Sequence, residues 1–336
     1  MKPRSIDIHF HVVPPRFVDA VRRGTFAEIV ELTREGGTDR MVYHAPADVV
    51  LEPGTTLPAY LYDEGLILEA LDRRGLDAAA LGPSPEEFYY WTPPAVGARI
   101  AAMQNDGMAE LVRSHRDRFA GLATLPMQDP DRAAAELERA VTELGLRGAE
   151  ICTHINGRDL DHPSLRPVYA AAERLGAPLF LHPQNWGDMR RFHDYALWNL
   201  AGFPLETALA ASHLIMGGVF ERFPKLRVIL AHGGGYLPYQ VGRLDHGWAA
   251  RREVHDRLPR RPSEYLANLY CDSLTHSGLS LRFLLDRMGA GHVVIGSDYP
   301  FNMGDERPVD TVRALRLPSD VEAKVLATNL AGLLGV

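Results

Sequence analysis

Short runs of apolar and β-branched residues recur along the chain, and each is followed by a stretch whose apolar positions lie three or four residues apart. This alternation is typical of a parallel sheet whose strands are connected by helices. Eight runs fit the strand pattern: Ser5–His11, Asp77–Gly82, Phe119–Leu125, Gly148–Thr153, Pro178–His182, Arg227–His232, Asn268–Asp272 and His292–Asp298. Eight such units predict a (β/α)8 TIM barrel of the α/β class, which takes about 250 residues or more.

Two connecting stretches illustrate the helical pattern. Asp129–Leu144 has the required apolar spacing, and Ser164–Leu175 begins with Ser164 as a predicted N-cap. An open doubly wound sheet is the alternative architecture. It normally carries a glycine-rich nucleotide-binding turn after its first strand, and the sequence has no such turn.

The segment between the first two predicted strands is too long for an ordinary strand-to-helix loop. A helix is expected around Pro15–Arg34, followed by a polar stretch that contains Gly and Pro. We therefore expect approximately residues 12–76 to form a small insertion, or flap, over the barrel mouth. The whole chain, residues 1–336, is predicted to be a single domain.

Composition narrows the classes of partner. Apolar residues make up 46% of the chain, charged residues 24%, and the net charge is -7. An acidic balance gives no reason to expect nucleic acid, and no apolar run has the roughly 20 residues of a membrane span. The protein is expected to be cytoplasmic and to act on a small molecule. Cys152 and Cys271 lie in predicted strands and are expected to be buried free thiols.

The first predicted strand contains the sequence Asp7-Ile-His-Phe-His. Residues two apart in a strand point to the same face, so His9 and His11 lie on one side. Imidazole nitrogen binds zinc and neighbouring first-row metals. A His-x-His pair also arises by chance in a chain with 14 histidines.

Three further polar residues close predicted strands: His182 the fifth, His232 the sixth and Asp298 the eighth. Active sites of such barrels are built at the C-terminal strand ends. Burying these groups separately would require a polar partner for each one. Their common position therefore predicts a metal site at the barrel mouth.

Several motifs in this order resemble the amidohydrolase superfamily, in the branch typified by aminocarboxymuconate-semialdehyde decarboxylase. They are Asp7-Ile-His-Phe-His, Leu181-His-Pro, Phe220-Glu-Arg-Phe-Pro-Lys, His232-Gly-Gly-Gly, Gly242-Arg-Leu-Asp with Trp248, Arg261-Pro-Ser-Glu-Tyr and Gly296-Ser-Asp-Tyr-Pro-Phe. The resemblance spans nearly the whole chain.

The resemblance implies that His9, His11, His182 and Asp298 bind one divalent metal ion, expected to be zinc, with manganese or cobalt as alternatives. It assigns His232 as the general acid/base, beside Asp298 as the other catalytic group. Many superfamily members bind two metals through a carboxylated lysine at the end of strand four. No lysine follows that strand here, which predicts a single ion.

The same resemblance implies nonoxidative decarboxylation of an aromatic or conjugated unsaturated carboxylic acid. A bound metal stabilises negative charge on a substrate oxygen and activates water, so hydrolysis of an amide, ester or lactone is the alternative reaction. A barrel retained only for binding or assembly is a third hypothesis.

A carboxylate substrate requires a cation. Arg243 and Arg251 flank Trp248 on a predicted helix and are candidates, although both can equally be surface arginines. The resemblance favours Arg243, donated to the neighbouring site of a homodimer. Trp186 and Phe301 are candidates to stack on a planar ring. Relatives carry a further arginine in the first insertion, but residues 43–62 contain none.

Overall fold

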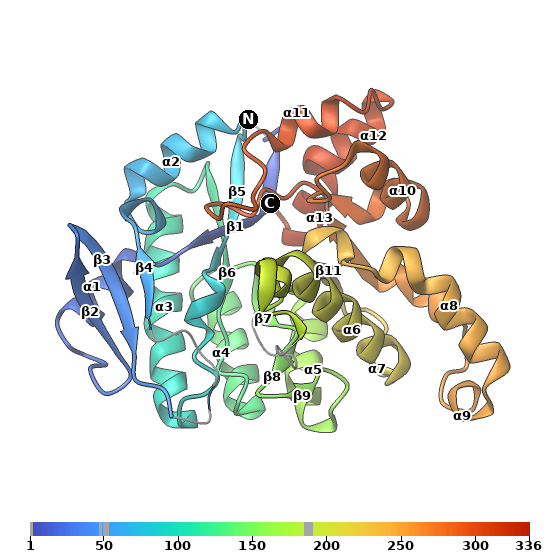
Figure 1. Cartoon of the computed structure of the whole chain (residues 1–336), viewed down its shortest axis with the longest axis horizontal. Helices are drawn as coiled ribbons and strands as arrows, with labels where there is room; N and C mark the ends of the chain where they lie inside the picture. The colour runs from blue at the N-terminus through green and yellow to red at the C-terminus, as the bar shows by residue number, and fades with distance from the viewer. Residues whose placement is uncertain (1–2, 47–48, 50–53, 185–190) are drawn as a thin grey trace.

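The computed structural model describes residues 3–46, 49, 54–184 and 191–336 (Figure 1). Eight parallel strands form one sheet in the order β1-β5-β6-β7-β10-β11-β12-β13. Their bounds are β1 (Ile6–Val12), β5 (Ala78–Pro83), β6 (Phe119–Ala123), β7 (Gly148–Cys152), β10 (Leu179–His182), β11 (Val228–Leu230), β12 (Leu269–Asp272) and β13 (Val293–Val294). Each of the eight strands overlaps one of the eight predicted runs.

Hydrogen bonds between the first strand and the last segment close the sheet into a barrel. The amide of Ile8 donates to the carbonyl of Ile295 at 3.0 Å, and the amide of His11 donates to the carbonyl of Tyr299 at 2.8 Å. The predicted (β/α)8 barrel is therefore confirmed.

Helices surround the sheet (Figure 1). They are α1 (Pro15–Arg22), α2 (Glu64–Arg73), α3 (Pro94–Ser114), α4 (Pro130–Thr142), α5 (Arg166–Leu175), α6 (Phe203–Met216), α7 (Val219–Arg222), α8 (Leu237–Ala250), α9 (Arg252–His255), α10 (Gly278–Met288), α11 (Pro308–Arg313), α12 (Ser319–Ala323) and α13 (Asn329–Leu334). Within the described ranges, no helix has both the length and the apolar character that a membrane span requires.

Helix α4 shows how the sequence forms these elements. The Asp129 side chain caps it by accepting the amide of Arg132 at 3.2 Å, and Pro130 occupies its first turn. Its buried face consists of Ala133, Leu137 and Ala140, which recur at helical spacing. Helix α5 differs from the prediction, because a 3-10 turn (Pro163–Leu165) precedes it and Ser164 lies inside that turn.

The segment after β1 contains α1 and a three-stranded antiparallel sheet formed by β2 (Val30–Glu35), β3 (Thr38–Tyr43) and β4 (Gly54–Leu57). The helix expected over residues 15–34 ends at Arg22, so this prediction was wrong for its second half. Gly24 has a left-handed φ of 74°, which ends the helix, and the β-branched residues beyond it pair with β3.

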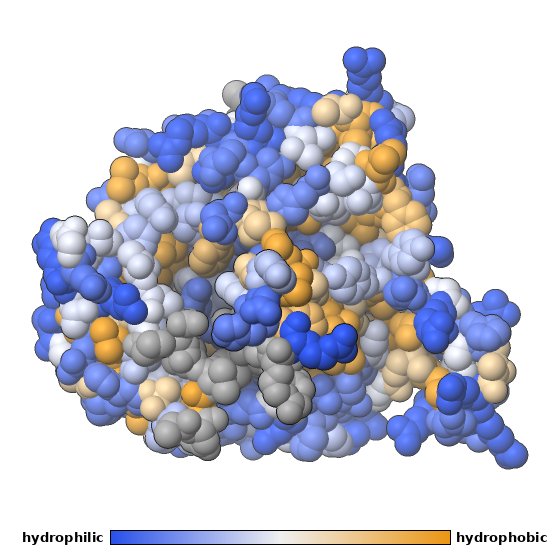
Figure 2. All heavy atoms as spheres, in the orientation of Figure 1, coloured by the Kyte–Doolittle hydropathy of each residue, from blue (hydrophilic) through white to orange (hydrophobic). Residues whose placement is uncertain are grey.

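The barrel core and the insertion core are separate apolar clusters. A third, smaller cluster includes Ile8, Phe180 and Leu330 from strands and the last helix. Figure 2 shows polar residues (blue) over much of the outer surface and apolar residues (orange) gathered near the middle of this face. A two-stranded sheet, β8 (His154–Ile155) with β9 (Arg158–Asp159), follows β7.

Candidate active site

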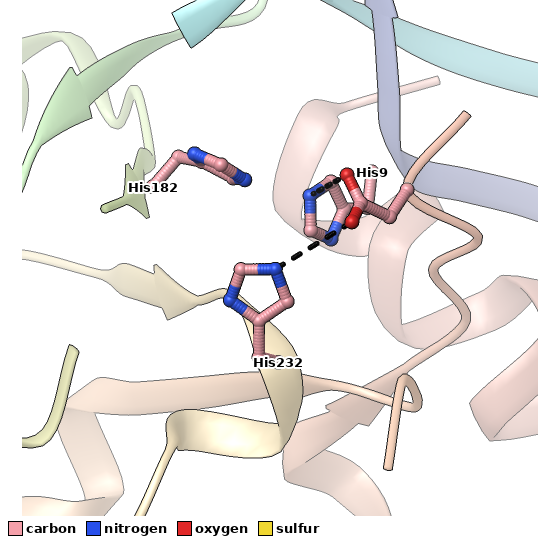
Figure 3. Close-up of side chains that lie close together, drawn as sticks. His9, His182 and His232 are labelled. Atoms are coloured by element: carbon pink, nitrogen blue, oxygen red, sulfur yellow. Dashed lines mark ion pairs between the residues drawn. The ribbon is translucent and has the colours of Figure 1, made fainter. Parts of the chain in front are cut away.

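The C-terminal side of the barrel brings the four predicted metal ligands together. His9 and His11 lie on β1, His182 ends β10, and Asp298 follows β13. The Nε2 atoms of His9 and His11 lie 3.1 and 3.4 Å from Oδ1 of Asp298. The ring centroid of His182 lies 5.0 Å from that of His9 and 4.8 Å from that of His11. The imidazoles of His9 and His182 face a common space beside a carboxylate (Figure 3).

Several buried polar atoms of this cluster have no hydrogen-bond partner. They are Nε2 of His9, Nε2 of His11, both ring nitrogens of His182 and Oδ1 of Asp298. Leaving such an atom unsatisfied costs roughly 1–3 kcal/mol. A divalent cation would satisfy one nitrogen of each imidazole and the Asp298 oxygen, because imidazole nitrogen and carboxylate oxygen are preferred ligands of first-row metals. The residues present therefore fit a metal ion.

The protonation states of the cluster suit a cation as well. Burial and the neighbouring imidazoles of His11 and His9 lower the pKa of His182 well below its ordinary value, so its ring is neutral. Burial opposes ionisation of Asp298, but the adjacent imidazoles of His9, His11 and His232 hold its pKa well below the usual range. A neutral imidazole and an ionised carboxylate are the forms that bind metals.

The other ring nitrogens of the two β1 histidines are fixed by neighbouring strands. His9 Nδ1 lies 2.6 Å from Oδ2 of Asp272, which ends β12, and His11 Nδ1 lies 2.9 Å from the carbonyl of Pro83. Such contacts set the tautomer and turn Nε2 toward the ion. Asp7, which precedes these histidines, instead accepts the amides of His9 and Ser297 at 2.8 and 3.1 Å.

Sequence reasoning missed Asp272, although it closes the seventh predicted strand. Its carboxylate also accepts the backbone amides of His232, Gly233 and Leu274 at 2.9, 2.7 and 3.1 Å. One buried carboxylate therefore orients His9 and anchors the turn that carries His232. The available signal was its strand-end position, shared with the other candidate residues.

His232 was predicted to close the sixth strand, but β11 ends two residues earlier at Leu230, and His232 begins the 3-10 turn η7 (His232–Gly234). Its Nε2 lies 3.6 Å from Oδ2 of Asp298, and its ring centroid lies 5.1 Å from that of His182. Figure 3 shows its ring turned toward the same space as His9 and His182. With 15% of its side chain exposed, His232 is the most accessible member of the cluster.

The three glycines after His232 allow this close approach. All three have positive φ, between 59° and 76°. A Cβ at Gly235 would lie 2.0 Å from the carbonyl oxygen of Pro204. A side chain at that position would therefore push α6 away from the turn, and the imidazole of His232 with it.

A cavity of about 560 Å³ opens beside His232 and Asp298. Its apolar walls include Phe203, Leu274 and Phe283 from α6, the loop after β12, and α10. The Phe203 ring lies nearly parallel to that of His232, with an interplanar angle of 15°. A cavity of this size and lining suits a planar organic molecule whose polar group faces the histidines.

The comparison with protein families identifies the chain. The amidohydrolase family model matches residues 6–336. The chain belongs to the amidohydrolase family.

A curated protein and two solved structures show which amidohydrolases this chain is similar to. The 2-amino-3-carboxymuconate-6-semialdehyde decarboxylase of Dictyostelium discoideum is 34% identical, over 99% of this chain and 92% of its own. Among solved structures, 5-carboxyvanillate decarboxylase from Sphingomonas paucimobilis has a TM-score of 0.81 and 29% identity, covering 99% of both chains. A dihydroxybenzoic acid decarboxylase from Polaromonas, with bound manganese and 2-nitroresorcinol, has a TM-score of 0.79 and 25% identity, covering 100% of this chain and 97% of its own.

The predicted substrate-binding residues of this amidohydrolase lie in different places. The Phe301 ring centroid is 5.3 Å from that of His11, so Phe301 borders the histidine cluster. Trp186 lies outside the described residues. Arg243 is exposed on α8, and Arg251 is exposed at the end of that helix, with its guanidinium 3.5 Å from Glu253. Neither arginine is among the residues that line the 560 Å³ cavity.

Strand four holds an acidic residue that sequence reasoning, which looked only for lysine, missed. Glu150 on β7 is 0% exposed, and neither of its carboxylate oxygens has a hydrogen-bond partner. Its Oε1 lies 3.6 Å from Nδ1 of His11. A charged residue within a strand of buried apolar residues was the available signal. Cys152 on the same strand and Cys271 are buried free thiols, as predicted.

Proposed function

We propose that this protein is a metal-dependent nonoxidative decarboxylase of an aromatic or conjugated unsaturated carboxylic acid. The observation that carries the proposal is the convergence of His9, His11, His182 and Asp298, whose inward atoms are buried and lack hydrogen bonds. The three relatives described above are named as decarboxylases of such acids, which supports the reaction.

The four residues would hold one divalent ion, which we propose to be zinc, with manganese as the alternative. Manganese is the metal in the structure of the Polaromonas relative. When bound, the ion supplies a positive charge that stabilises negative charge on a substrate oxygen. Asp272 and the Pro83 carbonyl keep the Nε2 atoms of His9 and His11 directed inward.

His232 would transfer the proton. Its Nε2 faces the cluster, and imidazole exchanges a proton near neutral pH. The proton is delivered to the ring or chain carbon that bears the carboxylate. The carbon–carbon bond then breaks, carbon dioxide leaves, and its bonding electrons restore the conjugated system of the product. The apolar walls of Phe203 and Leu274 exclude water beside this carbon.

We propose that residues 12–76 form a flap within the single domain. The insertion is attached to the barrel mouth, because the hydroxyl of Tyr299, next to Asp298, donates to the carbonyl of Tyr60 at 2.6 Å. The amide of Val13 also donates to the carbonyl of Leu61 at 2.8 Å. These contacts support the proposal, because Tyr299 follows Asp298, one of the proposed metal ligands.

We propose that the working unit is a homodimer in which Arg243 serves the neighbouring subunit. Arg243 follows Tyr239 by one helical turn on α8, and Tyr239 is 74% exposed where it lines the cavity. Exposed Leu279 and Phe283 on α10 continue this apolar surface. Large exposed apolar patches are typical of interfaces, and an arginine here would reach a partner's substrate carboxylate.

The reaction is tested with a substrate panel. Metal-replete enzyme is incubated with hydroxybenzoates, muconate semialdehydes and lactones, while carbon dioxide and acid release are followed separately. Carbon dioxide release from an unsaturated acid is the expected result. Acid release without carbon dioxide would instead establish the hydrolase, which uses the same ligands on a different electrophile.

The metal site is tested by elemental analysis of purified protein. One ion per chain is expected, and its identity decides between zinc and manganese. Two ions per chain would contradict the single-ion site, and a chain that binds no divalent metal would overturn the proposed function.

The dimer is tested by mixing two inactive variants, Arg243→Ala and His232→Ala. If Arg243 acts across the interface, a mixed dimer has one site with both residues intact, and random exchange restores about a quarter of wild-type turnover. An arginine that acts within its own chain would leave the mixture inactive. Sedimentation of each variant checks that it still dimerises.

A further inference from the structure

Glu150 is a fully buried carboxylate with no hydrogen-bond donor on either oxygen. It lies in the middle of β7, and all five residues of that strand are buried. Removing an ionised carboxylate from water without a partner costs several kcal/mol, so proteins pair such a group or place it on a metal. The partner of Glu150 must therefore be found among its neighbours.

The imidazole of His11 does not supply that partner. His11 Nδ1 lies 3.6 Å from Oε1 of Glu150, but the same nitrogen faces the carbonyl of Pro83 at 2.9 Å. A separation of 3.6 Å is beyond a hydrogen bond. The carboxylate of Glu150 is thus close to His11 without being bound by it.

A metal ion fits the position better. Glu150, His11 and His182 each offer one ligand atom, and these atoms all lie within 4.8 Å of one another. With metal–ligand bonds of about 2.0–2.2 Å, two ligands of one ion lie up to about 4.4 Å apart. The spread of up to 4.8 Å slightly exceeds this span, so a single ion would contact all three residues only if their side chains moved closer together on binding.

Strand β5, which β6 separates from β7 in the sheet, leaves room for this carboxylate. Gly82 on β5 is paired in register with His11, and a Cβ at Gly82 would lie 2.0 Å from Oε2 of Glu150. Alanine at this position would therefore displace the carboxylate. The space that holds Glu150 against the histidines depends on a residue without a side chain.

We propose that Glu150 is a further ligand of the ion held by His9, His11, His182 and Asp298. The inference rests on the proposed metal site and adds a second carboxylate to it. Two carboxylates neutralise the charge of a divalent ion, and the extra oxygen ligand favours ions such as manganese and zinc over softer ones. A metal site with two carboxylate ligands has no excess positive charge to attract the substrate carboxylate. An arginine is then needed more strongly to bind that carboxylate.

The test uses Glu150→Gln, which keeps the shape of the side chain and removes its charge. The matched control is Glu87→Gln, because Glu87 is also buried but receives hydroxyl hydrogen bonds from Tyr43 in the insertion and from Tyr89. Metal affinity is measured by chelator competition, and coordination by the visible absorption of the cobalt-substituted protein. We expect Glu150→Gln to bind about 100-fold more weakly and to shift the cobalt band, with no change in Glu87→Gln.

A second variant, Gly82→Ala, keeps every ligand residue unchanged and displaces the Glu150 carboxylate, and we expect it also to shift the cobalt band. If Glu150→Gln does not fold, as judged by the circular dichroism of the metal-free protein, Gly82→Ala is used in its place. Wild-type affinity and an unchanged band in Glu150→Gln would overturn the proposal. Weaker binding with an unchanged band would also overturn it, since Glu150 would then act only through its charge.

The experiment separates this proposal from the function on which it rests. Wild-type protein that takes up no cobalt would overturn the metal centre itself. Wild-type protein that binds one ion, with Glu150→Gln indistinguishable from it, would remove Glu150 alone and leave the proposed decarboxylase intact. If the wild type binds two ions and Glu150→Gln loses one of them, Glu150 would be a ligand of a second ion. That result would overturn the proposal that Glu150 binds the ion held by the three histidines and Asp298.

Discussion

Two buried polar clusters in this molecule differ in how their hydrogen bonds are satisfied. Under the insertion, Glu87 accepts the hydroxyls of Tyr43 and Tyr89, and the Tyr43 hydroxyl also contacts that of Thr55 at 2.8 Å. At the barrel mouth, the inward atoms of the histidine cluster have no partner. A complete network stabilises a fold, whereas an incomplete one at the same depth indicates a missing ligand.

The comparison is sharpest between the two buried glutamates. Burial raises the pKa of Glu87 to about 7, and it raises the pKa of Glu150 to about 7 as well. A perturbed pKa alone therefore does not distinguish a structural carboxyl from a functional one. The donors around each carboxylate do, because Glu87 has two and Glu150 has none.

Removing a ligand from the incomplete cluster gives the largest expected effect. His182→Ala deletes two unpartnered ring nitrogens from the centre of the cluster. We expect the variant to lose its metal and its turnover, as measured by elemental analysis and carbon dioxide release.

Its fold should persist, because the deleted ring has no hydrogen bond to lose. A His182→Ala protein that keeps one ion per chain and wild-type turnover would show that the cluster does not bind metal through β10.

His232→Ala separates metal binding from proton transfer. The variant should retain its ion, because the four proposed ligands remain, but lose about 10²–10⁴-fold in turnover, the usual contribution of a general acid or base. Steady-state rates and metal content of the same preparation measure both. Unchanged turnover would remove His232 from the mechanism.

Asp272→Asn tests a residue that orients others. With its nitrogen in the position of Oδ2, asparagine still accepts the amides of Gly233 and Leu274 but loses the amide of His232. The same nitrogen faces Nδ1 of His9 and can reverse the tautomer of that ring. We expect metal affinity to fall about 10–100-fold, as for other residues that orient ligands. The conservative variant Asp272→Glu should recover part of the affinity. Equal affinity in wild type and Asp272→Asn would show that His9 is oriented without this carboxylate.

The parts of the site that the sequence predicted share one property, since each lies on a barrel strand or in the segment that follows the C-terminal end of one. His9, His11 and His182 are of this kind, and eight strands followed from periodicity alone. Asp272 has the same position but resembles an ordinary strand terminus in sequence, because its partners are backbone amides distant along the chain.

Other features depend on contacts that periodicity does not encode. The helix predicted over residues 15–34 becomes helix and strand because β2 pairs with β3, where Val30 lies opposite Tyr43. Glu150 lies within a strand, so only the three-dimensional packing of β7 against β10 and β5 brings it near the histidines.

The smallest effect on activity is expected from the complete cluster, where Glu87→Gln should leave turnover and metal content unchanged. Its effect is on stability against pH. The folded pKa of Glu87 is about 7, above its ordinary value of 4.5, so the folded state holds a proton that the unfolded state releases. Wild type therefore loses stability as pH rises between these values, by roughly 2–3 kcal/mol for this group, and the glutamine variant does not.

Thermal unfolding of both proteins at about pH 5 and about pH 8 measures this difference, because any other titrating groups are common to the two chains. The gap in melting temperature between wild type and Glu87→Gln should shift in favour of the variant at the higher pH. A gap that is independent of pH would mean that Glu87 is already ionised in the folded state. In that case the tyrosine hydroxyls stabilise the charge fully, and the two glutamates would differ in charge as well as in their hydrogen bonds.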